Sequence, residues 1–118
     1  MPTGPELFGI RNCDTMKKAF RWLETQGIDY QFHDYKKLGL GANKLAEWCE
    51  KTDWNILLNK RGLTWRRLSD ADKQDVDEDK AIRLMARNPS LIKRPVLECN
   101  DNIEVGFSPE RYVSFFNL

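Results

Sequence analysis

Three cysteines are the side chains of this 118-residue chain best suited to covalent chemistry, and they are Cys13, Cys49 and Cys99. No two of them have the C-x-x-C spacing of a dithiol redox motif, and an odd number does not fit a framework of paired disulfides. They also fall short of the four ligands that a structural zinc ion requires. We therefore expect free thiols in a reducing compartment, and no metal site.

Cys13 stands between an apolar run and the start of a helical pattern, which is a favourable place for a reactive thiol. Free backbone N–H groups and the helix dipole stabilise negative charge at the start of a helix, so a thiol there ionises more readily. Three basic residues close in sequence would add to this effect: Arg11, Lys17 and Lys18. Asp14 opposes it. By position alone, a small apolar residue that merely begins the helix is an equal alternative.

The other two cysteines and the single histidine are weaker candidates for chemistry. Cys49 shares an apolar helical face with Leu45 and Trp48, which favours a thiol packed in the core. Cys99 ends a strand and is either buried or a resolving thiol, with burial favoured. His33 has no second ligand at metal spacing, so a surface or hydrogen-bonded role is favoured over metal binding or acid–base catalysis.

The apolar pattern of the first 35 residues predicts the elements that position Cys13. An apolar run at 7–10 reads as a strand, and apolar residues spaced three and four apart over 16–23 indicate a helix. Gly27 ends that helix, and alternation over 28–32 is typical of a half-buried strand. The result is a βαβ unit with parallel strands and a right-handed crossover.

The remainder of the chain predicts a helical middle, a hairpin and a closing helix. The middle is polar and helical, and Asn88-Pro89 ends its last helix. A turn at 100–102 separates two short apolar strands, and Ser108-Pro109 suits the beginning of a final helix. This order predicts one domain over 1–118 with an α/β, thioredoxin-like fold: a mixed four-stranded sheet with a helical insertion in the middle of the chain.

The dipeptide Arg94-Pro95 stands where the first strand of the hairpin begins. A proline at a strand start cannot donate to the sheet, and an X-Pro bond is where a cis peptide is tolerated. A plain junction between loop and strand would explain the proline equally simply. In a thioredoxin-like fold, however, this loop faces the cysteine turn, and the residue before the proline offers its backbone to an extended peptide. We therefore predict that Arg94 lies beside Cys13.

Composition argues against several classes of partner. Hydrophobic residues make up 41% and charged residues 31%, which is enough apolar surface for a folded core. Nineteen basic and eighteen acidic residues leave a net charge of +1, which does not favour nucleic acid binding. A basic, aromatic cluster at 60–67 is followed by acids at 70–79, so a solvated face is favoured over RNA contact. Without a secretory signal or a long apolar run, we expect a cytoplasmic protein that contacts no membrane.

Four separated segments resemble those of one protein family, and they occur in the same order: F-G-I-R-N-C-D-T-M-K-K-A, L-L-N-K-R-G-L-T-W-R, P-S-L-I-K-R-P-V-L-E and V-G-F-S-P-E-R-Y. Together they resemble the ArsC/Spx family, and most closely its YffB branch. The resemblance implies a thioredoxin-like fold with a helical insertion, and it makes Cys13 the nucleophile. Resemblance to the arsenate reductases also carries over three oxyanion-side arginines: Arg61, Arg94 and Arg111. Such guanidiniums would keep a thiolate ionised and bind an oxyanion or carboxylate.

The chain also departs from two branches of that family. Arsenate reductases carry C-G-T-S-R at the nucleophile, of which Thr15 alone matches here, and a histidine four residues earlier, where this chain has Gly9. These differences argue against arsenate reduction. Spx regulators that use a C-x-x-C switch need a second cysteine where this chain has Met16, so that switch cannot operate.

The leading hypothesis is therefore a glutathione-dependent thiol reductase of the monothiol type. The Cys13 thiolate would attack a small-molecule or protein disulfide, and glutathione would act as co-substrate to resolve the mixed disulfide, with no bound cofactor. Residues expected to hold glutathione or the substrate's anionic group are Arg61, Arg94, Arg111, Thr15 and Pro95. Three alternatives remain: oxyanion reduction as in arsenate reductases, a non-enzymatic Spx-like adaptor that binds RNA polymerase, and a plain binding module. Participation of Cys49 or Cys99 is left open.

Overall fold

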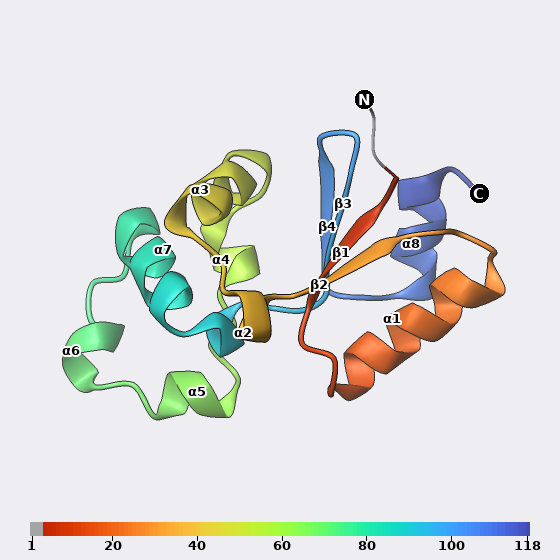
Figure 1. Cartoon of the computed structure of the whole chain (residues 1–118). Helices are drawn as coiled ribbons and strands as arrows, with labels where there is room; N and C mark the ends of the chain where they lie inside the picture. The colour runs from red at the N-terminus through yellow and green to blue at the C-terminus, as the bar shows by residue number, and fades with distance from the viewer. Residues whose placement is uncertain (1–3) are drawn as a thin grey trace. The chain divides into compact units, whose positions relative to one another are not determined.

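A computed structural model, which describes residues 4–118, contains a four-stranded sheet in the order β2-β1-β3-β4 (Figure 1). The strands are β1 (Glu6–Gly9), β2 (Gln31–Asp34), β3 (Val96–Cys99) and β4 (Asn102–Val105). β1 runs parallel to β2 and antiparallel to β3, and β3 and β4 form an antiparallel hairpin. The prediction of a mixed four-stranded sheet in a thioredoxin-like fold is confirmed.

Two helices cover one face of this sheet, and they are α1 (Asp14–Thr25) and α8 (Pro109–Phe116). They do so because alternate strand residues and one face of each helix are apolar. The fully buried side chains of this core are Leu7, Met16, Ala19, Leu23, Leu97 and Tyr112. Burying a leucine or methionine side chain stabilises the fold by roughly 1.5–3 kcal/mol, so this cluster fixes the two ends of α1 against β1 and β3.

Local sequence signals set the boundaries of these elements. Gly27 follows α1 with a φ of 69°, a left-handed conformation that costs little without a Cβ atom. Asn100 and Asp101 form the hairpin turn with φ angles of 50° and 68°, which asparagine and aspartate tolerate better than most residues. Ser108 caps α8, because its Oγ accepts a hydrogen bond from the Arg111 N–H at 3.1 Å. The predicted hairpin and closing helix are thus present.

A separate helical unit comprises Gly39–Lys93, and the sheet unit holds the chain up to Leu38 together with Arg94–Leu118. The helices of the insertion are α3 (Ala42–Lys51), α4 (Trp54–Leu57), α5 (Leu63–Arg66), α6 (Asp70–Lys73), α7 (Glu78–Arg87) and the 3-10 turn η1 (Pro89–Leu91). The predicted helical insertion is therefore confirmed, while a single domain over 1–118 stays a prediction. Across residues 4–118, none of the helices has the length and apolar character to cross a membrane.

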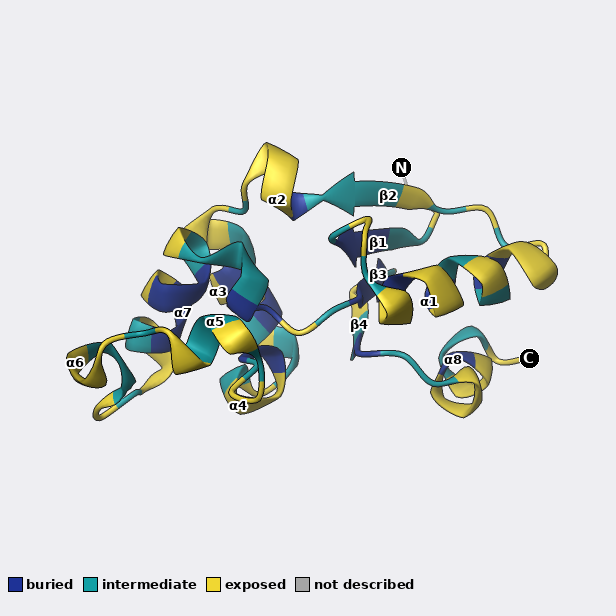
Figure 2. Cartoon of the chain, turned by 90° about the horizontal axis from the view of Figure 1, so that it is seen from below, coloured by how far each residue is buried: buried dark blue, intermediate teal, exposed yellow. Residues whose placement is uncertain are grey.

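Buried residues of α3 and α7, dark blue in Figure 2, form the core of the helical unit. They include Leu45, Trp48, Ala81, Leu84 and Met85, at spacings that place them on one side of each helix. Asp77 begins α7, since its carboxylate accepts a hydrogen bond from the Lys80 N–H at 2.9 Å. Cys49 lies half-buried on α3 beside this core, where the sequence favours a packed thiol.

Candidate active site around Cys13

Cys13 occupies the N-cap of α1, directly after the loop that follows β1. Its backbone is extended, with φ −151° and ψ 134°, and its carbonyl accepts the first hydrogen bond of the helix from the Lys17 N–H at 3.0 Å. The N-cap is the position from which a side chain meets the unpaired N–H groups of the first turn, here those of Thr15 and Met16. The sulfur therefore stands where a negative charge is stabilised.

Arg94 approaches Cys13 from β3, the strand next to β1. Phe8 pairs with Val96, so the residues just before β3 lie beside those just after β1. The Arg94 Nε donates a hydrogen bond to the Cys13 Sγ at 3.4 Å, and both side chains are half-buried. The peptide bond between Arg94 and Pro95 is cis, and Pro95 is buried, with its carbonyl accepting the Gly106 N–H at 2.8 Å. The structure thus brings together Cys13, Arg94, Pro95 and the first turn that contains Thr15.

These neighbours change the pKa of the Cys13 thiol. Partial burial raises it, but the Met16 N–H, the hydrogen bond and charge of Arg94, and the Thr15 N–H together outweigh burial and hold the pKa below its ordinary value. Cys49 has the opposite environment, because burial and the carboxylates of Glu78 and Asp53 raise its pKa to about 11. Cys13 and Cys49 thus differ in ionisation, and Cys13 is the better suited of these two thiols to nucleophilic attack.

Tyr35 is a further member of this site that the sequence analysis did not identify. It begins α2 (Tyr35–Leu38), directly after β2, and its side chain is 1% exposed and hydrogen-bonded to the Arg94 side chain. A signal for it was available. Because β1 and β2 are parallel, the residues that follow each strand meet at the same edge of the sheet, as Tyr35 and Cys13 do.

Of the two other predicted arginines, Arg111 lies in the sheet unit together with Cys13. Arg111 is held at the junction of β4 and α8: its guanidinium contacts Glu104 Oε2 at 2.7 Å, the Val105 carbonyl at 2.8 Å and Ser108 Oγ at 3.2 Å. Among residues 4–118, none of its hydrogen bonds or ion pairs reaches Cys13. Arg61 is exposed and belongs to the helical unit, so its part in the site stays a prediction.

The position four residues before Cys13 has no room for a side chain. A Cβ atom on the buried Gly9 would lie 2.4 Å from the Met16 Sδ, far inside normal contact distance. Met16 is itself completely buried, so any shift of its side chain must be accommodated within the core. A histidine at this position, as in arsenate reductases, would therefore require the Met16 side chain to move.

We expect Gly9→Ala to lower the free energy of unfolding by about 1–3 kcal/mol, because the added methyl overpacks the core against Met16. Urea denaturation measures this change. The matched control is the same substitution in a Met16→Ala background, where the cost of Gly9→Ala should fall below that in the wild type. An equal cost in both backgrounds would show that contact with Met16 is not its cause.

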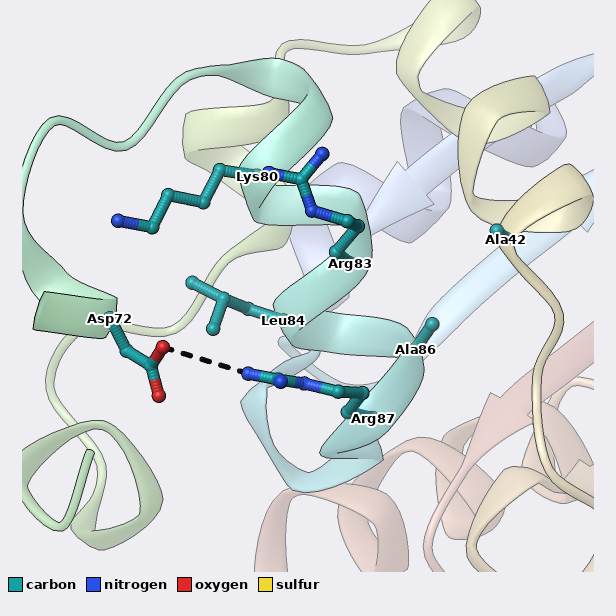
Figure 3. A pocket seen from close by; sticks show the side chains of 7 residues that line it. All are labelled: Ala42, Asp72, Lys80, Arg83, Leu84, Ala86 and Arg87. Carbon is teal, nitrogen blue, oxygen red and sulfur yellow. Dashed lines mark ion pairs between the residues drawn. The ribbon is translucent and has the colours of Figure 1, made fainter. Parts of the chain in front are cut away.

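The helical unit contains a hollow of about 390 Å³ (Figure 3). Its lining residues are Ala42, Asp72, Lys80, Arg83, Leu84, Ala86 and Arg87. Two of its basic groups already have partners: Lys80 Nζ donates to the carbonyls of Ala71, at 2.7 Å, and Gln74, and Arg87 Nη2 lies 3.7 Å from Asp72 Oδ1. No cysteine is among the residues that line this hollow.

Comparisons with known proteins agree with this arrangement. The chain is similar to the solved structure of a YffB protein, with 48% identity, a TM-score of 0.91 and coverage of 93% of this chain and 96% of the other. It is similar to an arsenate reductase (ArsC) related protein from Brucella melitensis, with 47% identity, a TM-score of 0.77 and coverage of 98% and 97%. It also matches the global transcriptional regulator Spx of Streptococcus mutans at 25% identity, over 92% of this chain and 80% of Spx.

The family model that describes the ArsC family matches residues 8–115. This range contains the cysteine turn, the helical insertion, the Arg94-Pro95 loop and most of α8. Sequence, fold and site geometry thus agree, and the chain belongs to the ArsC family.

Proposed function

We propose that this protein is a glutathione-dependent thiol reductase of the monothiol type. The observation that carries the proposal is the Cys13 sulfur at the N-terminus of α1, with Arg94 Nε at 3.4 Å and a pKa held below the ordinary value. A thiolate is the attacking species in thiol–disulfide exchange, so a site that favours ionisation favours this reaction.

The proposed cycle has two exchange steps. The Cys13 thiolate attacks the glutathione sulfur of a disulfide between glutathione and a small-molecule or protein thiol, forms the Cys13–glutathione mixed disulfide and releases the substrate sulfur as a thiolate. The thiolate of glutathione then attacks the glutathione sulfur of the mixed disulfide, which releases oxidised glutathione and restores the Cys13 thiolate. For each such substrate disulfide reduced, one free glutathione thiol is consumed and one molecule of oxidised glutathione is released, and no metal or bound cofactor is required.

Three features support resolution by an external thiol. Met16 stands where a C-x-x-C motif would have its second cysteine, and its side chain is fully buried. Cys99 lies at the opposite end of β3 from Arg94, and five residues of extended chain span about 16 Å. Cys49 has a pKa of about 11 and is protonated at neutral pH. Neither Cys99, by its position, nor Cys49, by its ionisation, is suited to act as a resolving cysteine.

The carboxylates of glutathione call for cationic partners. Arg94 already contacts the thiol, so its backbone beside Pro95 is proposed to align the tripeptide, as in the sequence hypothesis. Arg61, which is exposed, and Arg111 are proposed to hold carboxylates or an anionic group of the substrate. For Arg111 this requires sharing the guanidinium with Glu104, which it contacts at 2.7 Å.

Thiol labelling with iodoacetamide across a pH series tests the proposal. We expect Cys13 to be alkylated with a midpoint below the ordinary cysteine pKa, and Cys49 to react only near pH 11, because their environments shift the two pKa values in opposite directions. Cys49 is thus an internal control in the same sample. Oxidised glutathione should protect Cys13 selectively. A Cys13 midpoint at the ordinary value, with no protection, would remove the basis of the proposal.

A non-enzymatic adaptor is the second candidate, and the similarity to the Spx regulator of Streptococcus mutans favours it. Such a protein would bind RNA polymerase through its surface and would not need the thiolate. A pulldown with the Cys13→Ser variant separates the two functions: recovery of polymerase with the variant supports the adaptor, whereas loss of disulfide reduction supports the reductase.

A further inference from the structure

Tyr35 connects Arg94 to a fixed part of the sheet unit. Its side chain is 1% exposed and shares a hydrogen bond with the Arg94 side chain, which in turn contacts the Cys13 Sγ at 3.4 Å. We propose that Tyr35 is a positioning residue: its hydroxyl accepts a hydrogen bond from the Arg94 guanidinium and holds that group against the Cys13 sulfur. This inference rests on the proposed thiol chemistry of Cys13 and adds to it a residue that does not touch the sulfur.

The first argument for this role is the flexibility of arginine. An arginine side chain has many rotamers, so fixing it in one of them costs conformational entropy. A single hydrogen bond to sulfur is too weak to offset this entropy loss well. The Tyr35 ring, in contrast, has two side-chain torsions and is completely buried. A second hydrogen bond to a rigid partner fixes the guanidinium before the thiolate forms.

The second argument is that the backbone of Tyr35 is itself well anchored. Asp34 immediately before it pairs with Gly9 at the end of β1, the strand that leads to Cys13. The Asp34 carboxylate also accepts hydrogen bonds from the N–H groups of Lys36 at 3.1 Å and Lys37 at 3.3 Å, which fixes the start of α2. Tyr35 and Cys13 are therefore held by the same strand pair, and Arg94 is placed between them.

The third argument concerns charge. The charged and titratable groups that act on Tyr35 are Arg94, Cys13 and Asp34, and burial, the largest influence, raises its pKa to about 12. The hydroxyl thus remains a neutral phenol over the pH range in which Cys13 ionises. It can support Arg94 as an acceptor, and it adds no negative charge that would compete with the thiolate for the guanidinium.

The arrangement has a consequence for both exchange steps. When Cys13 enters the mixed disulfide, its sulfur is neutral and attracts Arg94 less, but the bond between Tyr35 and Arg94 does not depend on that charge. The guanidinium therefore stays in place and stabilises the Cys13 thiolate when it leaves in the second step. A leaving thiol with a low pKa departs faster, so Tyr35 should influence both attack and resolution.

Tyr35→Phe tests the proposal, since it removes the hydroxyl and keeps the ring. We expect the pH midpoint of Cys13 alkylation to rise by about half a unit, which is about threefold less thiolate at neutral pH. In an Arg94→Ala background the same substitution should cause no further shift, because the group that it positions is absent. Equal midpoints for the wild type and a folded Tyr35→Phe variant would overturn the inference.

Tyr112→Phe is the matched control. Tyr112 is a second fully buried tyrosine of the sheet unit, and its hydroxyl has no hydrogen-bond partner among residues 4–118. It packs against Trp22 and Phe107, not against Arg94. Its removal should leave the Cys13 midpoint unchanged. A shift as large as that of Tyr35→Phe would assign the effect to packing and overturn the positioning role.

A measurement on the unsubstituted chain covers the case in which Tyr35→Phe does not fold. With the ring carbon that bears the hydroxyl labelled in tyrosine, the NMR signal of Tyr35 should change at the Cys13 midpoint, and that of Tyr112 should not. A Tyr35 signal insensitive to Cys13 ionisation overturns the inference. The two proposals can fail independently. If Tyr35→Phe raises the Cys13 midpoint as expected but the wild type reduces no disulfide with glutathione, the reductase proposal fails and the positioning role of Tyr35 stands.

Discussion

Replacing Cys13 with serine should abolish disulfide reduction, lowering the glutathione-dependent rate by more than about a thousandfold. A serine hydroxyl remains protonated at neutral pH and cannot form the mixed disulfide through which the proposed cycle passes. The rate is measured with a mixed disulfide of glutathione and a small organic thiol in the presence of reduced glutathione, with formation of oxidised glutathione as the readout. Trapping the wild-type intermediate at acidic pH should give a glutathione adduct on Cys13 that the variant lacks.

Cys49→Ser is the matched control for this result. Cys49 is also half-buried, but its pKa of about 11 leaves it protonated in the assay. Its replacement should change the rate by less than about twofold if the fold is kept, since the thiol takes no part in either exchange step. Substantial reductase activity in Cys13→Ser, or its loss in Cys49→Ser, would show that a different thiol carries the reaction.

Arg94→Ala is expected to have the second largest effect, a loss of about tenfold to a hundredfold in rate at neutral pH. The substitution removes the side-chain hydrogen bond and the positive charge that lower the pKa of Cys13, while the N–H groups of α1 remain. Each unit by which the pKa rises reduces the thiolate fraction tenfold when the pH lies below the pKa. The measurements are the rate and the Cys13 alkylation midpoint over a pH series.

The pH dependence of this loss has a definite sign. Because the variant thiol ionises at higher pH, the difference from the wild type should shrink as the pH rises above the variant midpoint. The Cys13 midpoint and the rate of Arg94→Lys should fall between those of the wild type and Arg94→Ala, since lysine keeps the positive charge but lacks the Nε–H donor. Arg87→Ala, which removes an exposed arginine of the helical unit, is the control and should leave the midpoint unchanged. A rate loss of the same size at all pH values would show that Arg94 does not act by lowering the pKa of Cys13.

Stability should depend on pH through the same thiol. The folded-state pKa of Cys13 lies below its unfolded value, so folding favours the thiolate. This contribution is fully present above the unfolded pKa and is lost as the pH falls through the folded pKa. Between the two values, the free energy of unfolding of the wild type should rise with pH relative to Cys13→Ser, as denaturant titrations can measure.

Much of the fold could be predicted because its signals are local. Gly27, the Asn100-Asp101 turn and Ser108-Pro109 each act within a few residues, so the βαβ unit, the hairpin and the last helix follow from the sequence. In the helical middle, the end of the last helix at Asn88-Pro89 follows from the sequence, but the short helices before it do not. These short helices begin at caps such as Asp53 and Ser69, whose weak local signals do not reveal how a four-residue helix packs.

The site was predicted only in part because its contacts are long-range. Cys13 and Arg94 are separated by 81 positions, and their proximity is predicted from the place of the Arg94-Pro95 loop in a thioredoxin-like fold and not from spacing alone. Tyr35 gave no motif, since its role depends on which strands are parallel and where each one ends. Arg111, in contrast, is expected at the site from the motif resemblance, but the structure bonds it to Glu104. Its bond to Glu104 depends on how α8 packs beside β4, which a motif comparison does not contain.

The buried side chain of Met16 restricts how this site could be altered. It occupies the sequence position of the second thiol in dithiol relatives, and its sulfur also fills the space that a side chain at Gly9 would need. Met16 thus stands in the way of two changes. It takes the place of a second cysteine, and its side chain occupies the space that a residue larger than glycine would need at position 9. Engineering this scaffold toward either would have to begin by replacing that methionine, and a cysteine there would remove both obstacles in one step.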